Sequence, residues 1–388
     1  MGNLRRRIFE QEHELFRDTC RRFLDEHIVP HSDRWREAGI VDREAWKKAG
    51  DAGLLCMWAD EKYGGAGMTD FRFDQVLVEE MAKGGDSGFF ISLHNRIVGP
   101  YINHLGNDEQ KQKWLPGAVS GDIILAVAMT EPGAGSDVAG TRTKAEDCGD
   151  YWLLNGSKTY ISNGINCDLV VVAAKTNPDK PYEMGLFLVT PDMEGFARGR
   201  NLKKMGLKSQ DTAELFFEDV KVPKENILGE PGKGFYYLMQ FLAEERLMGA
   251  VGYLAGAQSA FDITMDFVKE RRMFGRPLAG FQNTRFKMAE MRAKLDMAQA
   301  FVDHCVLEHL DGELSADLAA EAKLLTSEIQ GDVVDECVQL HGGAGYMDEY
   351  RISRMYVDAR ISRIYAGTSE IMKEIIGRGL GLDQRKMN

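Results

Sequence analysis

One acidic side chain lies where a helix should be apolar. Glu245 belongs to a helical pattern that covers residues 234–272. Its neighbours one and two turns away are apolar residues or glycine: Leu238, Phe241, Met248 and Gly252. Burial of a carboxylate costs several kcal/mol unless the group is paired or protonated, and it raises the pKa toward the range useful to a general base. Glu245 is therefore a candidate catalytic base, although the spacing also fits a buried salt bridge with Arg246 or Arg271.

A glycine-rich string, MTEPGAGSD, follows a strand-like run and spans residues 129–137. Thr130 and Ser136 place hydroxyl groups near its two ends, and the residues between them expose main-chain N–H groups. Glycine lets the main chain approach a ligand closely, and successive backbone N–H groups bind anions. The string can therefore line a polar cofactor, while an ordinary glycine turn explains the same residues equally well.

Two further glycine-containing segments lie beside helical patterns, QLHGG at residues 339–343 and AGTSE at residues 366–370. Thr368, Ser369 and Glu370 resemble a helix N-terminus, where free N–H groups and the helix dipole favour an anion or a polarised carbonyl. Every helix has such an end, so this pattern alone does not identify a site.

Motifs for several other chemistries are missing from the sequence. It contains no GxGxxG dinucleotide fingerprint, no GxxxxGK[ST] phosphate loop and no GxSxG nucleophile elbow. His27 and His31 have the spacing of metal ligands on a helix, but Pro30 between them would disturb that helix. We therefore expect no metal site. The six cysteines include no CxxC pair, which argues against a disulfide framework and against a zinc site.

Charge and composition exclude further classes of protein. The 388 residues carry 48 basic and 60 acidic side chains, which gives a net charge of −12. Such a surface disfavours broad contact with nucleic acid or anionic membranes. The longest uncharged stretch, residues 247–261, is shorter than the roughly 18 residues that suggest a membrane span, and the opening residues lack the apolar core of a secretory signal. We expect a globular cytoplasmic protein without integral membrane association.

Three segments with different periodicity must position the candidate residues. They predict an N-terminal helical domain, a middle antiparallel β domain and a C-terminal four-helix bundle, at residues 1–120, 121–230 and 231–388. The expected fold class is α+β, mainly α. In the first segment, residues 10–27 and 71–81 are amphipathic helical runs, and Asn107 has the sequence context of a helix N-cap.

The middle segment has short strand-like runs separated by turn residues, without helical patterns between them. This arrangement favours antiparallel pairing in a small sandwich or barrel. The last segment has four long helical runs, near residues 234–272, 280–310, 315–340 and 349–377. Four such runs predict a helix bundle.

Taken together, the strings resemble the acyl-CoA dehydrogenase family over nearly the whole chain. The matching strings occur in the family's order and approximate spacing: MTEPGAGSD at 129–137, YISNG at 160–164, ERRMFG at 270–275, QLHGG at 339–343 and IYAGTSE at 364–370. The long-chain subtype is the most similar, because GFYYLMQ at 234–240 and ERLM at 245–248 are especially like it. The resemblance implies the same three-domain fold, FAD as cofactor and a homotetramer.

The resemblance also implies which residue is the base. In many members the catalytic glutamate immediately precedes the GTS string, where this chain has Ala366. In the long-chain and isovaleryl types it lies on the first bundle helix before an arginine, which corresponds to Glu245 and Arg246. Glu245 would remove the α proton of an acyl-CoA thioester while the flavin accepts the β hydride, and the product would be a trans-2-enoyl-CoA. A main-chain N–H near Ala366 would hold the thioester oxygen.

Further binding residues follow from the same resemblance. The implied cofactor-binding residues are Met129, Thr130, Ser136, Tyr160, Ser162, Arg271, Phe274, Gln282, Gln339, Gly342, Gly343, Thr368, Ser369 and Glu370. The implied substrate-binding residues are Ser136, Tyr236, Arg246, Ala366 and Gly367. Arg271, Phe274, Gln282 and residues 339–343 would contact the FAD diphosphate and adenine from the adjacent subunit. Without the resemblance, Arg271 fits a solvated helix face.

Electron-transfer flavoprotein is the electron acceptor that the resemblance implies. Two alternatives remain open: an oxidase-like or nitroalkane-type flavoenzyme of the same fold, and a non-catalytic acyl-CoA-binding scaffold. Arg96 occurs where the long-chain subtype would have a small residue. It would either favour a polar or carboxylated acyl tail or be a surface arginine.

Overall fold

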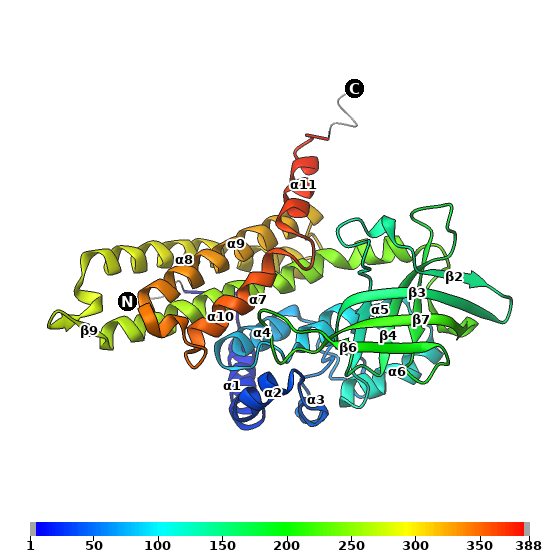
Figure 1. The fold of residues 1–388 in the computed structure, drawn as a ribbon, viewed down its shortest axis with the longest axis horizontal. Coiled ribbons are helices and arrows are strands. Elements are labelled where there is room, and N and C mark those ends of the chain that lie inside the picture. The colour runs from blue at the N-terminus through cyan, green and yellow to red at the C-terminus, as the bar shows by residue number, and fades with distance from the viewer. Residues whose placement is uncertain (1–4, 384–388) are drawn as a thin grey trace.

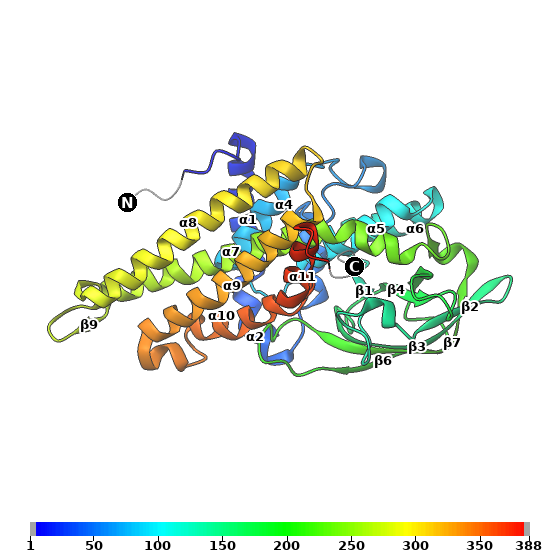
Figure 2. The same ribbon diagram turned by 90° about the horizontal axis from the view of Figure 1, so that it is seen from above.

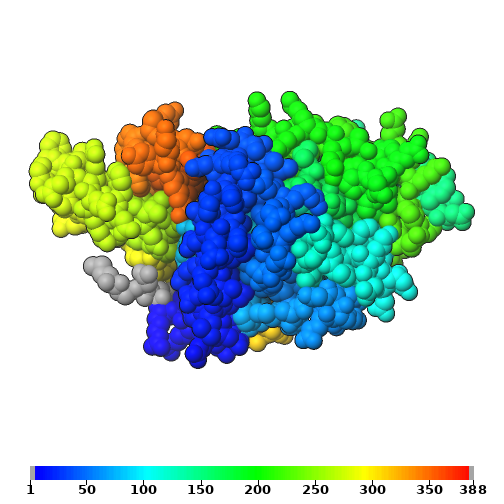
Figure 3. Space-filling model, turned by 90° about the horizontal axis from the view of Figure 1, so that it is seen from below, coloured from blue at the N-terminus to red at the C-terminus, as the bar shows by residue number. Residues whose placement is uncertain are grey.

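The computed structural model describes residues 5–383, and its elements change from helices to strands and back to helices along the chain. Figure 1 shows the long C-terminal helices on one side, the strands on the other and the N-terminal helices below them. The space-filling view in Figure 3 shows the N-terminal helices between the bundle and the strands. All three parts therefore border the middle of the molecule, where the site lies.

The N-terminal part contains six α-helices: α1 Gln11–His27, α2 Ser32–Ala38, α3 Arg43–Asp51, α4 Phe71–Gly84, α5 Gly99–Leu105 and α6 Asp108–Ser120. The amphipathic runs expected at 10–27 and 71–81 are confirmed as α1 and α4. Asn107 caps α6, since its side chain accepts a hydrogen bond from the Gln110 N–H while the Gln110 side chain accepts one from the Asn107 N–H. A π-helical turn, η3 at Leu93–Val98, precedes α5.

The middle part is one eight-stranded sheet: β1 Leu125–Ala128, β2 Lys144–Asp147, β3 Tyr151–Ser162, β4 Leu169–Lys175, β5 Met184–Val189, β6 Phe196–Asn201, β7 Thr212–Pro223 and β8 Ile227–Leu228. The strand order is β6-β7-β3-β2-β4-β5-β8, and β1 pairs with β4. The pairings are antiparallel except where β4 meets β1 and β2. The sheet is therefore mixed, with both parallel and antiparallel pairs, and β4 and β5 are almost entirely buried.

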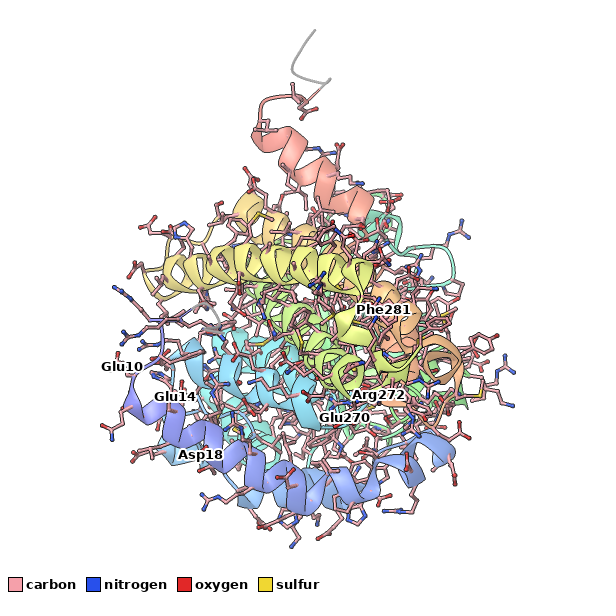
Figure 4. The ribbon with its side chains drawn as sticks, turned by 90° about the vertical axis from the view of Figure 1, so that its left-hand side faces the viewer. Glu10, Glu14, Asp18, Glu270, Arg272 and Phe281 are labelled. Atoms are coloured by element: carbon pink, nitrogen blue, oxygen red, sulfur yellow. The ribbon has the colours of Figure 1, made fainter. Side chains whose placement is uncertain are left out.

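The C-terminal part is a bundle built from α7 Gly234–Glu270, α8 Gln282–Leu310, α9 Ala316–His341 and α10 Arg351–Ala359, followed by α11 Ser369–Gly379. Figure 2 shows α7, α8 and α9 side by side over most of their lengths. A hairpin of β9 Arg272–Met273 and β10 Arg276–Pro277 joins α7 to α8. Figure 4 views this end of the bundle, where Glu270, Arg272 and Phe281 face outward.

The fourth expected run, 349–377, is not one helix. It is divided into α10, a 3-10 turn at Arg360–Arg363 and α11. Ala366 and Gly367 between them have positive φ angles of 53° and 92°, which a right-handed helix cannot contain. The break places this loop, instead of a helix surface, beside the cavity described below.

The helix α7 organises the molecule because it extends from the sheet to the far end of the bundle (Figures 1 and 2). Its buried side chains join the bundle core together with α8 and α9, and Phe71 of α4 packs into the same cluster. Among residues 5–383, no helix combines the length and the apolar character needed to span a bilayer.

Candidate active site

A cavity of about 580 Å³ lies where the three parts meet. Glu245 of α7, Ser162 at the end of β3 and Ala366 in the loop before α11 all line it. Three residues that are 83 to 204 positions apart in the chain therefore share one cavity, as the resemblance implied. Apolar side chains of α4, η3 and α7 form part of the wall: Val78, Met81, Leu93, Ile97 and Met248.

The carboxyl group of Glu245 has no hydrogen bond and no ion pair among the residues that the structure describes. Burial raises its pKa from 4.5 to about 7, and the neighbouring Arg246 charge only partly opposes this shift. The side chain keeps some accessible surface because it faces the cavity. A carboxylate with a pKa near neutrality beside an apolar cavity is suited to accept a proton from a bound ligand.

The expected alternative, a buried salt bridge of Glu245, is not formed. Arg271 lies beyond the C-terminal end of α7, roughly 39 Å from Glu245 along the helix at about 1.5 Å per residue. Arg246 is adjacent in sequence, and its guanidinium is buried without a hydrogen bond or salt bridge within 5–383. The Nε of Arg246 is thus a buried donor without a hydrogen-bond partner in the part of the chain that the structure describes.

Both expectations for Arg96 are wrong. Its side chain is buried, so it is not a surface arginine, and its Nε donates to Asp74 Oδ2 at 2.7 Å. Its Nη1 lies 3.3 Å from Glu244 Oε1, and Glu244 Oε2 lies 3.5 Å from His309 Nε2. Two carboxylates already compensate Arg96, and it does not line the cavity, so it does not attract a carboxylated acyl tail. The same contacts exclude Glu244 as a free base.

The loop before α11 presents main-chain groups to the cavity. Ala366 lines the cavity, and no acceptor within residues 5–383 takes a hydrogen bond from its N–H. Thr368 is the N-cap of α11, since its hydroxyl accepts from the Ile371 N–H at 3.3 Å, which confirms the expected helix start. Ser369 donates to Glu328 at 2.7 Å, and Glu370 is exposed. The loop therefore offers an unpaired N–H, while Thr368 and Ser369 already have partners.

Lys323 of α9 contacts this loop and was missed by the sequence analysis. Its ammonium is fully buried and donates to the Gly367 carbonyl at 2.6 Å. The signal was present, because a lysine interrupts a small-residue stripe of α9 in the way that Glu245 interrupts the stripe of α7: Ala319, Ala320, Thr326 and Ser327, all buried.

The glycine-rich string follows the end of β1, and none of its residues lines the cavity. Glu131 accepts hydrogen bonds from the N–H groups of Arg142 and Thr143 and from the Lys158 ammonium, which also donates to the Met129 carbonyl at 2.9 Å. Thr130 is tied to β3 through the Thr159 N–H at 2.9 Å. These bonds are internal, so Glu131 and Lys158 hold the strand end in place.

The outer part of the string is open. Ser136 is exposed, and a Cβ added at Gly133 or Gly135 would meet no atom within 4 Å. Tyr160 has a positive φ of 59° and leaves its ring 69 % exposed. A non-glycine residue in this conformation carries strain, and an exposed aromatic ring held in this way suggests a stacking surface. Ser162, two residues on, reaches the cavity.

A second group of predicted residues lies at the far end of the bundle. Arg271, Gln282, Gln339, Gly342 and Gly343 are exposed, and Phe274 at the hairpin tip is 89 % exposed with a φ of 49°. The ring of His341 stacks on Phe267 with centroids 4.1 Å apart, which joins the end of α9 to the end of α7. Within one chain this group lies at the hairpin end of the bundle (Figure 2), and none of its residues lines the cavity, whose last lining residue on α7 is Gly256.

Tyr236 also lies outside the cavity. It is 64 % exposed near the start of α7, two to three turns before Glu245. A ligand with an aromatic ring system and anionic groups fits these features: the cavity wall, the guanidinium of Arg246, the N–H of Ala366 and the exposed aromatic rings. FAD has this chemistry, and the residues that would hold its ring near the cavity are Thr130, Tyr160 and Ser162.

Comparison with known proteins agrees with this geometry. Three family models match the chain: the acyl-CoA dehydrogenase N-terminal domain at residues 10–122, the middle domain at 126–220 and the C-terminal domain at 232–381. The mouse (Mus musculus) protein named long-chain specific acyl-CoA dehydrogenase, mitochondrial, is 48% identical over 97% of this chain and 88% of its own length.

Solved structures give the same result. The crystal structure of an acyl-CoA dehydrogenase from Geobacillus kaustophilus superposes with a TM-score of 0.94 at 48% identity, over 96% of this chain and 99% of the other. A glutaryl-CoA dehydrogenase from Mycobacterium smegmatis, solved in complex with FADH2, has a TM-score of 0.89 at 30% identity, over 96% and 95% of the two chains. The chain belongs to the acyl-CoA dehydrogenase family.

Proposed function

We propose that Glu245 is the base with which this FAD-dependent acyl-CoA dehydrogenase removes the α proton of its thioester substrate. The observation that carries the proposal is an unpaired carboxyl group whose pKa is raised to about 7 at the wall of a cavity that apolar side chains of α4, η3 and α7 also line. Ala366 stands at the position before the GTS string, so the alternative position of the family's base holds no carboxylate in this chain. The match with the ERLM string of the long-chain subtype supports the same assignment.

The chain's own residues have three tasks in the reaction. The Ala366 N–H would donate to the thioester oxygen, where negative charge develops as the α proton leaves. The apolar wall would exclude water from the acyl chain, which strengthens each charge interaction inside the cavity. Arg246, buried beside Glu245, would favour the anionic form of the base or contact the substrate. FAD, when bound, supplies the hydride acceptor that makes the product a trans-2-enoyl-CoA.

The cofactor site that we propose uses two separate groups of residues. Main-chain and hydroxyl groups at Met129, Thr130, Ser136 and Ser162, with the ring of Tyr160, would surround the flavin. The group at the hairpin end would hold the diphosphate and adenine of FAD bound to another subunit: Arg271, Phe274, Gln282, Gln339, Gly342 and Gly343. Their position outside the cavity of their own chain supports sharing between subunits, and the homotetramer that the resemblance implies would allow it.

Several finer assignments are also part of the proposal. Gly367, Thr368, Ser369 and Glu370 would lie along the cofactor or substrate through the loop before α11, and Tyr236 would contact the exposed part of the substrate. Domain limits at 1–120, 121–230 and 231–388 are supported by family matches that leave gaps near residues 123–125 and 221–231. The cytoplasmic location stays a prediction, since the mouse relative is named mitochondrial.

We propose electron-transfer flavoprotein as the electron acceptor. One solved structure is similar to this chain with a TM-score of 0.91 at 34% identity, and its description names the electron transferring flavoprotein of Acidaminococcus fermentans. The test is anaerobic addition of straight, branched and dicarboxylic acyl-CoAs to the purified holoenzyme, with the flavin absorbance recorded. Bleaching by at least one substrate, followed by reoxidation on addition of electron-transfer flavoprotein, supports the proposal.

The same experiment separates the alternatives. Reoxidation by oxygen with stoichiometric peroxide, at a rate that electron-transfer flavoprotein does not increase, would identify an oxidase-like enzyme. If the purified protein does not bind flavin, and if acyl-CoA causes no change in its absorbance, the protein is a non-catalytic scaffold and the proposal is refuted.

A further inference from the structure

The Lys323 ammonium is buried and forms no salt bridge within residues 5–383. Its side chain is inaccessible to solvent, and the Gly367 carbonyl at 2.6 Å is its single hydrogen-bond acceptor within residues 5–383. No carboxylate in that part of the chain forms a salt bridge with it. An ammonium has three N–H donors, and burial of such a charge is costly unless it is compensated. Burial of an apolar side chain of the same length would cost less free energy at this position.

The group that Lys323 contacts belongs to the most unusual backbone of the site. Gly367 has a φ of 92° and the preceding Ala366 a φ of 53°. A left-handed conformation at alanine is strained, so it persists only when surrounding contacts impose it. Ala366 lines the cavity that contains Glu245, and its N–H is unpaired within residues 5–383. The strained turn and the unpaired donor are thus adjacent.

Other contacts attach the residues before and after this turn to α9. Before the turn, Arg363 Nε lies 3.2 Å from Glu328 Oε2, and its Nη2 donates to the Glu328 carbonyl at 3.1 Å. Gly331 leaves the space for this guanidinium, because a Cβ there would come within 2.2 Å of Nη2. After the turn, Ser369 donates to Glu328 at 2.7 Å. Lys323 is the contact to the turn itself.

We propose that Lys323 is a positioning residue for the dehydrogenation: by holding the Gly367 carbonyl, its ammonium keeps the Ala366–Gly367 turn in the conformation that leaves the Ala366 N–H free for the thioester oxygen. This inference rests on the proposed role of the Ala366 amide. Lys323 is not among the residues that line the cavity, and its hydrogen bond goes to the Gly367 carbonyl, so it acts through the loop. Its positive charge behind the loop also favours negative charge on the thioester oxygen.

The charges around Lys323 fit this role. Burial is the main reason that its pKa is lowered to about 8, and the nearby Arg246 lowers it further, whereas Glu328 and Glu370 raise it. With a pKa near 8 the ammonium is mainly protonated at neutral pH. The buried charge of Lys323 therefore costs free energy and adds little to the stability of the fold, which is typical of a group that is retained for activity.

The test compares Lys323→Met, which removes the donor and the charge, with Lys323→Arg, which keeps both. Lys269→Met is the matched control, because Lys269 is an exposed lysine on the adjoining helix α7. Each holoenzyme is assayed for FAD content, melting temperature, kcat and KM. Each is then mixed with a 2-aza-acyl-CoA that carries a 13C carbonyl. In this analogue an NH replaces the α carbon, so it cannot be dehydrogenated, and its carbonyl stretch is recorded by difference infrared spectroscopy.

We expect Lys323→Met to retain FAD and to melt at the same or a higher temperature, because an uncompensated buried charge has been removed. Its kcat should fall by about 10²-fold with little change in KM, since a displaced donor affects the transition state more than binding. Its carbonyl stretch should move toward the value of the free analogue. Lys323→Arg should recover part of both losses, and Lys269→Met should resemble the wild type.

The outcomes distinguish this inference from the proposed function. A wild-type enzyme that does not lower the carbonyl stretch would refute the Ala366 donor itself. A lowered stretch that is fully retained in Lys323→Met would overturn the role of Lys323 alone. Loss of FAD, or a lower melting temperature together with the loss of activity, would show that Lys323 is merely structural and would also overturn the inference.

Discussion

Replacement of Glu245 by Gln tests the base directly. The amide has nearly the shape of the carboxyl group but cannot accept the α proton. General acid–base groups typically contribute 10²-fold to 10⁴-fold, so we expect the rate of flavin reduction by acyl-CoA to fall by about 10³-fold. FAD should stay bound because Glu245 contacts none of the residues proposed to hold it. Anaerobic stopped-flow measurement of flavin bleaching gives the rate without interference from the electron acceptor.

The raised pKa predicts a second, independent effect on stability. Between pH 4.5 and about pH 7 the folded protein holds the Glu245 proton more tightly than the unfolded chain does, so this site loses stability as pH rises through that window. At about 1.4 kcal/mol per pH unit, the full window corresponds to about 3 kcal/mol. This is an upper value, because the part of the side chain that faces the cavity is screened by solvent.

The Gln variant lacks this titration, so its melting temperature should exceed that of the wild type at pH 8 and match it at pH 4.5. The wild-type reduction rate should rise with pH and level off above about pH 7 as the base loses its proton. Glu244→Gln is the control, because Glu244 contacts Arg96 and His309 instead of the cavity. It should keep the pH profile of flavin reduction. An unchanged reduction rate in Glu245→Gln would refute the assignment of the base.

Three further predictions concern other parts of the molecule. Phe274→Ala should increase the loss of FAD on dilution, measured by the fluorescence of released flavin, and should weaken subunit association, measured by light scattering. If the variant retains FAD as well as the wild type does, sharing of FAD between subunits is contradicted. Arg96→Met should lower the free energy of unfolding by about 3 kcal/mol because Asp74 is left buried and unpaired, and a second change to Asn at Asp74 should restore much of it. Gly252→Val should reduce kcat/KM for long acyl-CoAs more than for butyryl-CoA, because Gly252 lines the cavity and a Cβ added there would lie 3.3 Å from Val78. If kcat/KM falls equally for both substrates, Gly252 does not border the space that the acyl chain occupies.

Some predictions from sequence rested on neighbours within one or two helical turns, and the structure confirms several of these. The start of α6 was predicted from Asn107, and the start of α11 from Thr368 in the same way. The interruption of an apolar stripe at Glu245 is also local, because the helical period places its neighbours without knowledge of the rest of the fold. The family resemblance then supplied a chemical meaning for that interruption.

Other features could not be predicted because their partners come from distant parts of the chain. Arg96 is compensated by Asp74, 22 positions away, and by Glu244, 148 positions away, and no local pattern indicates either contact. The fourth bundle run is broken between Ala359 and Ser369 although its sequence has helical periodicity. One contact to the turn within this break comes from Lys323, 44 positions earlier than Gly367.

Sequence by itself thus determined which segments are helices and strands, where several of them begin, and that one acid interrupts an apolar helix face. Only the tertiary structure decided that this acid is unpaired, that Ser162 and Ala366 share its cavity, and that Arg271 lies far from it. The reason is physical. The periodicity that indicates a helix or a strand is contained within a few residues, whereas the pKa and partners of a buried charge depend on every element packed around it.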